Sequence, residues 1–212
     1  MSYGRTVLLK KGKVGAFMHK PANRKTLVAV HIDLKGVLFK PSYFDQLMRD
    51  LSAQGINAAL VEYEDVFPFK GLDIAYDRGD RWSEGTLRSF LAAAKRHGVE
   101  IIPLQQCLGH LEYLFRWNRY RKHTEYHAYP GTLCLSNKAG KALVADMLCQ
   151  VMTAHPDSRY IHLGMDEAHK LATCPKCRRK GDILTVFLNY LDELCDVCTA
   201  NGKTPIIWTD ML

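Results

Sequence analysis

Short apolar runs alternate along this chain with segments of helical periodicity. The runs are rich in branched residues and predict strands that are buried on both faces, as in a parallel sheet. Between them, apolar residues recur every three or four positions, as Phe44, Leu47, Met48 and Leu51 do, which predicts amphipathic helices. The predicted strands cover residues 27–33, 58–62, 100–104, 160–163 and 205–208, and the predicted helices begin near Pro41, Ser83, Asn137 and Asp182.

Strict alternation of strands and helices predicts parallel pairing, in either an open doubly wound sheet or a (β/α) barrel. Polar residues follow every predicted strand, which favours a barrel because an open sheet gathers them at one switch point. They are Asp33, Lys35, Glu62, Glu64, Asp65, Gln105, Gln106, His110, Asp166, Glu167 and Asp210. We therefore predict an α/β chain that holds about the first five units of a (β/α)8 TIM barrel in residues 27–212. Residues 1–26 are expected to form an arm with a β-hairpin, its strands at 6–9 and 14–18.

The composition is that of an ordinary soluble globular protein, with 212 residues of which 47% are hydrophobic and 24% are charged. The formal net charge is +7, and the densest basic segment, residues 116–123, interleaves aromatic residues with cations. A solvated basic surface is the commoner origin of such a segment, so no nucleic-acid partner is expected. No apolar stretch approaches membrane-spanning length and no signal sequence is recognisable, so we expect no membrane contact and a cytoplasmic location.

Two adjacent acids, Asp166 and Glu167, directly follow the predicted strand 160–163. Neighbouring carboxylic acids at a strand end do not both ionise easily, so we expect at least one raised pKa, as a general acid requires. A helix start is the alternative, because acids also offset the positive end of a helix dipole. The acids with Ala168 and His169 spell the DEAH box of helicases, but no complete phosphate-binding loop precedes them. A metal held with His162 or His169 is a further alternative, although a histidine in mid-strand is more often a core residue.

The cysteines offer a different kind of site. Their number, seven, argues against a disulfide framework. Cys174, Cys177, Cys195 and Cys198 have the C-x2-C…C-x2-C spacing of a structural zinc site. However, Cys195 and Cys198 also continue a predicted core stripe of one helix, which consists of Leu184, Phe187, Leu188 and Leu191. We therefore expect no metal and no cofactor, with zinc at these four cysteines as the alternative. Of the two pairs, Cys174 and Cys177 are the better candidates for a metal-binding or redox-sensitive pair, in a surface loop.

Several segments together resemble one enzyme family. The sequence HLGMDE at residues 162–167 resembles the H-x-G-G-D-E signature of glycoside hydrolase family twenty, the β-N-acetylhexosaminidases, with Met165 at the second glycine. Further segments are similar, in the same order, to the hexosaminidase D-like branch of that family: residues 30–36, 60–68, 103–112, 155–156 and 208–212. The family fold is a (β/α)8 barrel, which agrees with the pattern of strands and helices.

The resemblance implies removal of terminal N-acetylglucosamine or N-acetylgalactosamine from a glycan by a substrate-assisted, retaining mechanism. In that mechanism the substrate's 2-acetamido oxygen attacks the anomeric carbon and forms an oxazolinium intermediate. Glu167 is then the general acid and base, and Asp166 orients the acetamido group and stabilises its positive charge. Substrate-binding roles are implied for His110, Trp208, Asp33, Glu62, Glu64 and Asp210. The alternatives are ion pairs with Lys35 and arginines at the barrel rim for Asp33, Glu62 and Glu64, and core packing for Trp208.

Two departures from the family pattern change the expectations. Lys35 stands where many members use an arginine near the first strand, so the choice between the two sugars stays open. Strands six to eight of a barrel are absent from this sequence, so we expect the 212-residue chain alone to have little activity and exposed sheet edges that a second copy could cover. A non-enzymatic carbohydrate-binding module, or a zinc-stabilised module on a partial barrel, is the competing prediction.

Overall fold

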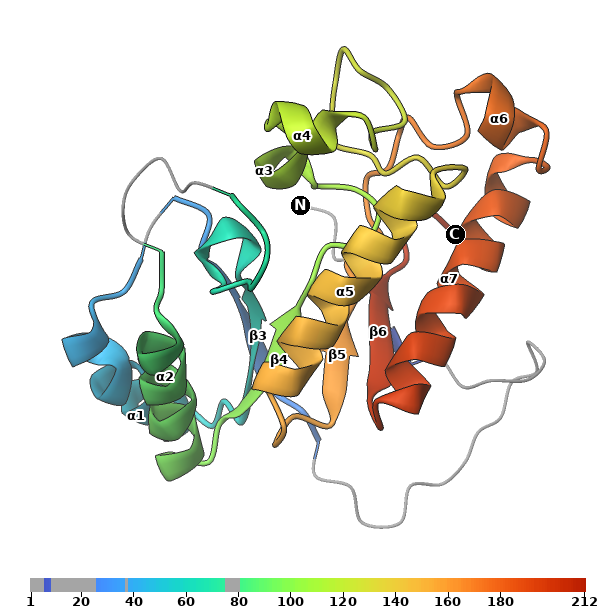
Figure 1. The fold of residues 1–212 in the computed structure, drawn as a ribbon. Helices are drawn as coiled ribbons and strands as arrows, with labels where there is room; N and C mark the ends of the chain where they lie inside the picture. Colours follow the sequence, from blue (N-terminus) through green and yellow to red (C-terminus); the bar gives the residue numbers. More distant parts are fainter. Residues whose placement is uncertain (1–5, 9–25, 37, 75–80) are drawn as a thin grey trace.

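The computed structural model describes residues 6–8, 26–36, 38–74 and 81–212, and its centre is a six-stranded sheet (Figure 1). The strand order is β1-β6-β5-β4-β3-β2, with parallel pairing from β2 to β6 and antiparallel pairing of β1 with β6. The bounds are β1 Thr6–Leu8, β2 Ala29–Asp33, β3 Ala58–Glu62, β4 Glu100–Leu104, β5 Tyr160–His162 and β6 Thr204–Trp208. The five predicted parallel strands are therefore confirmed, and they form part of a (β/α) barrel wall.

Helices follow the strands and cover one face of the sheet (Figure 1). The long helices are α1 Phe44–Ala53, α2 Glu84–Arg96, α5 Lys138–Ala154 and α7 Ile183–Ala200. Shorter pieces are η1 Pro41–Tyr43, η2 Glu64–Val66, α3 Glu112–Phe115, α4 Asn118–Arg121 and α6 Pro175–Arg178. Three predicted helix starts are capped by side chains, because Ser83, Asn137 and Asp182 each accept a hydrogen bond from a backbone N–H three residues later.

The sheet separates two apolar layers. Its outer face packs on the helices through residues such as Val61, Ile101 and Ile207. Its inner face carries a smaller apolar cluster, formed by Ala58, Leu60, Ile102, Leu104, Tyr160 and Ile206. Exposure alternates along β2, which pairs only with β3 within the described part of the chain. The inner face of the sheet is therefore open to solvent on the β2 side, next to the carboxyl ends of the strands.

The predicted N-terminal hairpin is described only in part. Residues 6–8 form β1, whose partner is β6, with Thr6 opposite Trp208. The predicted second strand, residues 14–18, lies outside the described residues.

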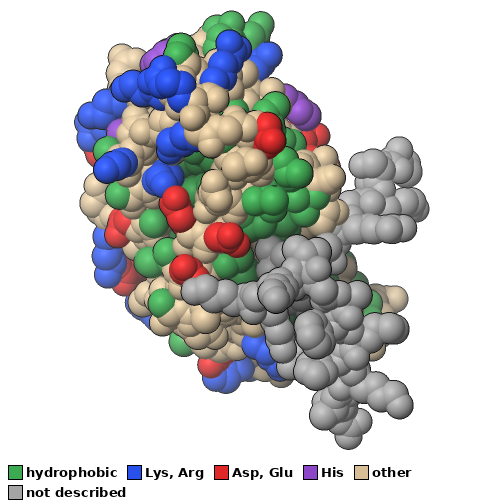
Figure 2. Space-filling model, turned by 90° about the vertical axis from the view of Figure 1, so that its right-hand side faces the viewer, with side chains coloured by type: hydrophobic (Ala, Val, Ile, Leu, Met, Phe, Trp, Pro, Cys, Tyr) green, Lys and Arg blue, Asp and Glu red, His purple; other side chains and the backbone are tan. Residues whose placement is uncertain are grey.

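The predicted core stripe of α7 is wrong in part. Phe187, Leu191 and Cys198 are buried as expected, but Leu184 is 51% exposed and Leu188 is 41% exposed. Helix α7 lies on the side of Figure 1 that faces the viewer in Figure 2, and hydrophobic side chains appear among charged ones on that face. The buried face of α7 also includes Val186, Tyr190 and Leu194. Among the described helices, none combines the length and apolarity needed to cross a membrane.

Candidate active site

A pocket of about 290 Å³ lies where β2 to β6 end. Strand register brings these ends into line, because Asp33 pairs with Glu62, Leu104 pairs with His162, and His162 pairs with Ile206. The pocket is lined by His31, Asp33, Lys35, Glu62, Gln106, His110, Asp166, Glu167 and Trp208. Six of the eight predicted site residues therefore share one hollow, and they come from the ends of five different strands.

Asp166 and His110 form the central pair of the pocket. His110 Nε2 lies 3.4 Å from Asp166 Oδ2, and only about a quarter of either side chain is exposed. The hydrogen bond to Asp166 is the main reason why the pKa of His110 rises to about 9, against the opposing effect of burial. Burial also opposes ionisation of Asp166, but the hydrogen bond and charge of His110 outweigh it and lower the pKa of Asp166. At neutral pH the pair is therefore an imidazolium and a carboxylate.

One glycine allows this pair to form. Gly109 lies against the backbone of the loop after β5, and a Cβ at Gly109 would collide with the carbonyl oxygen of Asp166. The loops after β4 and β5 therefore approach each other without a side chain between them. This contact places His110 directly beside Asp166.

Glu167 presents its carboxylate to the open side of the pocket. Its side chain is 61% exposed, and its Oε2 lies 3.5 Å from His110 Nε2. The backbone is in the left-handed region, with φ values of +76° at Met165 and +46° at Glu167. Asp210 Oδ2 accepts a hydrogen bond of 2.9 Å from the Glu167 N–H, which supports this backbone turn. The turn directs the two adjacent acids into different environments.

The second side of the pocket is a charged network at the ends of β2 and β3. Glu62 is buried and accepts a hydrogen bond of 3.0 Å from Gln106 Nε2, while His31 Nε2 lies 3.3 Å from its other oxygen. Burial disfavours its charge, but these two hydrogen bonds and Lys35 lower the pKa of Glu62 below its ordinary value. Glu64 contacts Lys35 Nζ at 3.1 Å. Burial outweighs this contact and raises the pKa of Glu64 to about 7.

Trp208 forms a wall of the pocket at the end of β6. Its ring centroid lies 4.5 Å from that of His162 and 5.9 Å from that of His31. His162 is buried, and this burial lowers its pKa to about 3. Its Nδ1 accepts a hydrogen bond of 3.0 Å from the Gly164 N–H. His162 is therefore a neutral core residue that supports the tryptophan.

Two predicted site residues do not line the pocket, and three lining residues were not predicted. Asp210 contacts the Glu167 backbone, and Glu64 acts on the pocket through Lys35. The unpredicted residues are His31, Lys35 and Gln106. Strand alternation was the available signal for His31, because it lies two positions before Asp33 and so on the same face. The pKa of Asp166 is lowered, so the raised pKa predicted for at least one acid of the pair does not belong to Asp166.

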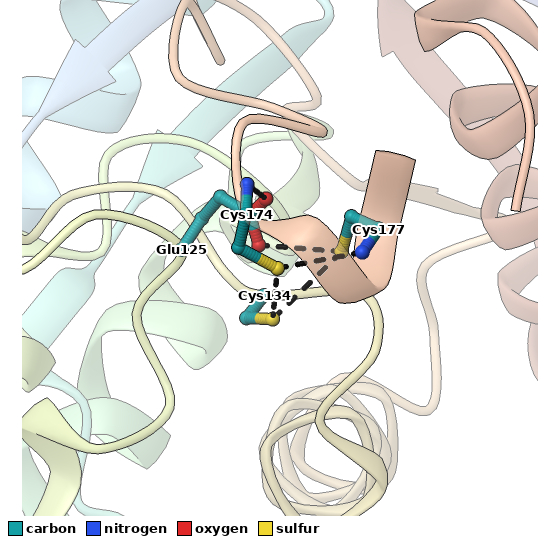
Figure 3. Close-up of side chains that lie close together, drawn as sticks. All are labelled: Glu125, Cys134, Cys174 and Cys177. Carbon is teal, nitrogen blue, oxygen red and sulfur yellow. Dashed lines mark hydrogen bonds between the residues drawn. The ribbon is translucent and has the colours of Figure 1, made fainter. Parts of the chain in front are cut away.

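Among the described residues, only one of the two C-x2-C pairs belongs to a cluster of potential metal ligands. Cys174 and Cys177 lie close to Cys134 and Glu125 (Figure 3). Cys195 and Cys198 do not belong to this group, which corrects the zinc alternative built on the two C-x2-C pairs. The spacing suggested the wrong second pair because α7 directs Cys198 into the core. In the described residues, Asp166 and Glu167 are not part of any such metal-binding group with His162 or His169.

Comparison with known proteins shows the family of the chain. The sequence profile of the glycosyl hydrolase family 20 catalytic domain matches residues 56–212. The chain belongs to glycosyl hydrolase family 20. Hexosaminidase D of Bos taurus is 30% identical to it over 190 residues, covering 86% of this chain and 55% of the bovine protein. Hexosaminidase D of Homo sapiens is also 30% identical over 190 residues, covering 86% of this chain and 39% of the human protein. This family 20 chain thus spans about half the length, or less, of these curated relatives.

Solved structures show the same fold at low sequence identity. The chitobiase of Flavobacterium johnsoniae superimposes with a TM-score of 0.74 at 17% identity, over 86% of this chain and 31% of that protein. The β-N-acetylhexosaminidase of Bacteroides fragilis gives a TM-score of 0.68 at 17% identity, over 84% of this chain and 40% of that protein. The family 20 chain therefore has the fold of a (β/α)8 barrel over the part that it covers, as predicted.

Proposed function

We propose that this chain carries the acid–base half of a β-N-acetylhexosaminidase site. The main support is that two adjacent carboxylates lie in different environments of the same pocket. Asp166 is held as an anion by His110, and Glu167 is exposed. Substrate-assisted hydrolysis needs one carboxylate to stay charged while its neighbour gives and takes a proton. Membership of family 20 and the similarity to hexosaminidase D support the same chemistry and do not favour the non-enzymatic alternative.

In the proposed first step, the acetamido oxygen of a terminal N-acetylhexosamine attacks its own anomeric carbon. Glu167 donates its proton to the glycosidic oxygen as the bond to the aglycone breaks, and an oxazolinium forms. Asp166 accepts the acetamido N–H and stabilises the positive charge. Its Oδ1 supports this role, because it is buried and has no hydrogen-bond partner among the described residues.

In the proposed second step, the ionised Glu167 takes a proton from water, which opens the oxazolinium with overall retention. Trp208 forms the wall beside the acetamido methyl group. Asp33 and Glu62 bind sugar hydroxyls on the other side of the pocket, with Lys35 between them. The proposed partner is a glycan or glycoconjugate that ends in N-acetylglucosamine or N-acetylgalactosamine.

The test uses protein from the complete reading frame that contains this chain. Glu167→Gln is expected to lower kcat on an aryl N-acetylglucosaminide by about 10²- to 10⁴-fold, the usual contribution of a general acid–base group. The loss should be smaller for a dinitrophenyl aglycone, which leaves without protonation. Asp166→Asn should slow both substrates alike. The control Glu193→Gln changes an exposed acid paired with Lys141 on the protein surface and should keep full activity.

Substrate assistance has its own test. The same aryl glycoside with a 2-hydroxyl in place of the acetamido group should not be hydrolysed, because it lacks the nucleophile. Rapid hydrolysis of the 2-hydroxyl analogue would refute the proposed function. Full activity of Glu167→Gln on the aryl N-acetylglucosaminide without the dinitrophenyl aglycone would refute it too.

A further inference from the structure

A cluster of three thiols and one carboxylate lies outside the pocket. Cys134 Sγ is 3.8 Å from Cys174 Sγ and 3.8 Å from Cys177 Sγ (Figure 3). Glu125 Oε2 is 3.3 Å from Cys177 Sγ, and the four ligand atoms all lie within 4.8 Å of one another. The cysteines are free thiols, not disulfides. Three soft donors and one hard donor therefore converge on one point.

These distances agree with a tetrahedral metal site. Zinc–sulfur bonds are about 2.3 Å long, so two sulfurs of a regular tetrahedron are about 3.8 Å apart. With a zinc–oxygen bond of about 2.0 Å, the sulfur-to-oxygen distance is about 3.5 Å. The two measured sulfur separations and the contact between Cys177 and Glu125 lie close to these values.

The burial of Glu125 independently points to a cation. The residue is 6% exposed, and the polar contacts of its carboxylate in the described part of the chain are the Cys174 N–H at 2.8 Å and the thiols of the cluster. None of these partners carries a positive charge. Burial of a carboxylate without a cation is unfavourable, and a bound metal ion would remove that penalty.

The surrounding backbone holds the four ligands in place. Glu125 and Cys134 directly follow the two residues of a short antiparallel bridge, Thr124 and Leu133, and the Glu125 N–H donates to Thr132 O while the Cys134 N–H donates to His123 O. Cys174 and Cys177 occupy the turn that begins α6, where the Cys177 N–H lies 3.4 Å from Cys174 Sγ. The Cys174 N–H donates to the Glu125 carboxylate and the Cys177 N–H donates to Cys174 Sγ. Hydrogen bonds of this kind orient metal ligands from outside the coordination shell.

We propose that Glu125, Cys134, Cys174 and Cys177 bind one structural Zn²⁺ ion. Four protein ligands leave no open position, which is the arrangement of a structural and not a catalytic zinc. The ion joins the loop after β4, which carries His110, to the loop after β5, which carries Asp166 and Glu167. It thereby holds together the two loops that form the proton-transfer side of the pocket, whatever reaction the pocket performs.

The first experiment measures metal content by mass spectrometry on untagged protein from the complete reading frame, purified with a reductant and without chelators. We expect about one zinc per chain in the wild-type protein. Cys174→Ser combined with Cys177→Ser should lower the zinc content at least ten-fold. The matched control is Cys149→Ser combined with Cys195→Ser, two partly buried cysteines on α5 and α7 outside the cluster, and it should retain the metal.

The second experiment needs no folded cysteine variant. Wild-type protein stripped of metal is titrated with Co²⁺, and a tetrahedral thiolate site gives sulfur-to-cobalt charge-transfer bands and intense visible bands. Glu125→Gln should keep the sulfur bands but weaken cobalt binding at least ten-fold, because the charged fourth ligand is lost. An unchanged affinity would remove Glu125 from the ligand set and overturn the site as stated.

The proposal is also overturned by wild-type protein that holds less than about a tenth of a zinc per chain when zinc is supplied during expression, or by a control that loses as much zinc as the test variant. A disulfide between two of the three cluster cysteines, in protein purified with a reductant, would also overturn the zinc proposal. Each readout is independent of hydrolase activity, so failure of the zinc proposal and failure of the proposed function are distinguishable.

Discussion

Replacement of Asp166 by Asn should remove the charge that keeps His110 protonated. In the wild-type protein, the hydrogen bond and charge of Asp166 raise the pKa of His110 from 6.5 to about 9. Burial has the opposite effect on that pKa, and Asp166→Asn leaves burial in place. The pKa of His110 should therefore fall to about 6.5 or below. Glu167, at 3.5 Å from the imidazole, is too exposed to replace the lost charge.

The size of this effect follows from the two pKa values. At 1.36 kcal/mol per pH unit, the change from 6.5 to about 9 corresponds to about 3 kcal/mol. Because 27% of the His110 side chain and 21% of the Asp166 side chain are exposed, solvent screening reduces the expected contribution to about 2 kcal/mol. The sign follows from the raised pKa. The folded state holds the proton of His110 up to about pH 9, so the stabilisation is present below pH 6.5 and is lost as the pH rises through 9.

The assay is an NMR titration of protein labelled with ¹⁵N at histidine, with His110→Gln used to assign the signal. Thermal unfolding between pH 6 and 10 measures the linked stability, which should fall in the wild-type protein and change much less in Asp166→Asn. Asp33→Asn is the control, because Asp33 lines the same pocket without contacting His110. A wild-type His110 pKa near 6.5, or one that stays near 9 in Asp166→Asn, would refute the reasoning.

Two further predictions concern stability and close packing. Burial raises the pKa of Glu64 from 4.5 to about 7, so the stability of the wild-type protein should fall as the pH rises from 4.5 to 7. Glu64→Gln should reduce that fall by up to about 3 kcal/mol in denaturant titrations at pH 5 and 8. A pH dependence identical in both proteins would contradict it. Gly109→Ala should destabilise the fold by about 1–3 kcal/mol and lower kcat, because the new Cβ separates the loops after β4 and β5. Its control, Gly85→Ala, has room for the methyl group, so equal losses in the two variants would count against the predicted contact.

The strands and helices could be predicted because their signals are local. Apolar runs and caps such as Ser83 and Asn137 lie within a few residues of the elements that they specify. The position of Asp166 and Glu167 at a strand end was also visible in the sequence. Leu184 and Leu188 were misassigned because periodicity defines a stripe on a helix without showing how much of its width a neighbour covers.

The sequence by itself determined the order of strands and helices, the set of polar residues at the strand ends, and the acid pair with its resemblance to family 20. The tertiary structure decided which acid is held as an anion and which acid has a raised pKa, since His110 lies against Asp166 whereas Glu64 is buried beside Lys35. It also selected Glu125 and Cys134, not the second C-x2-C pair, as neighbours of Cys174. The physical reason is the same in both cases: pKa values and ligand sets depend on distances of a few ångströms between residues far apart in the chain, and packing alone sets those distances.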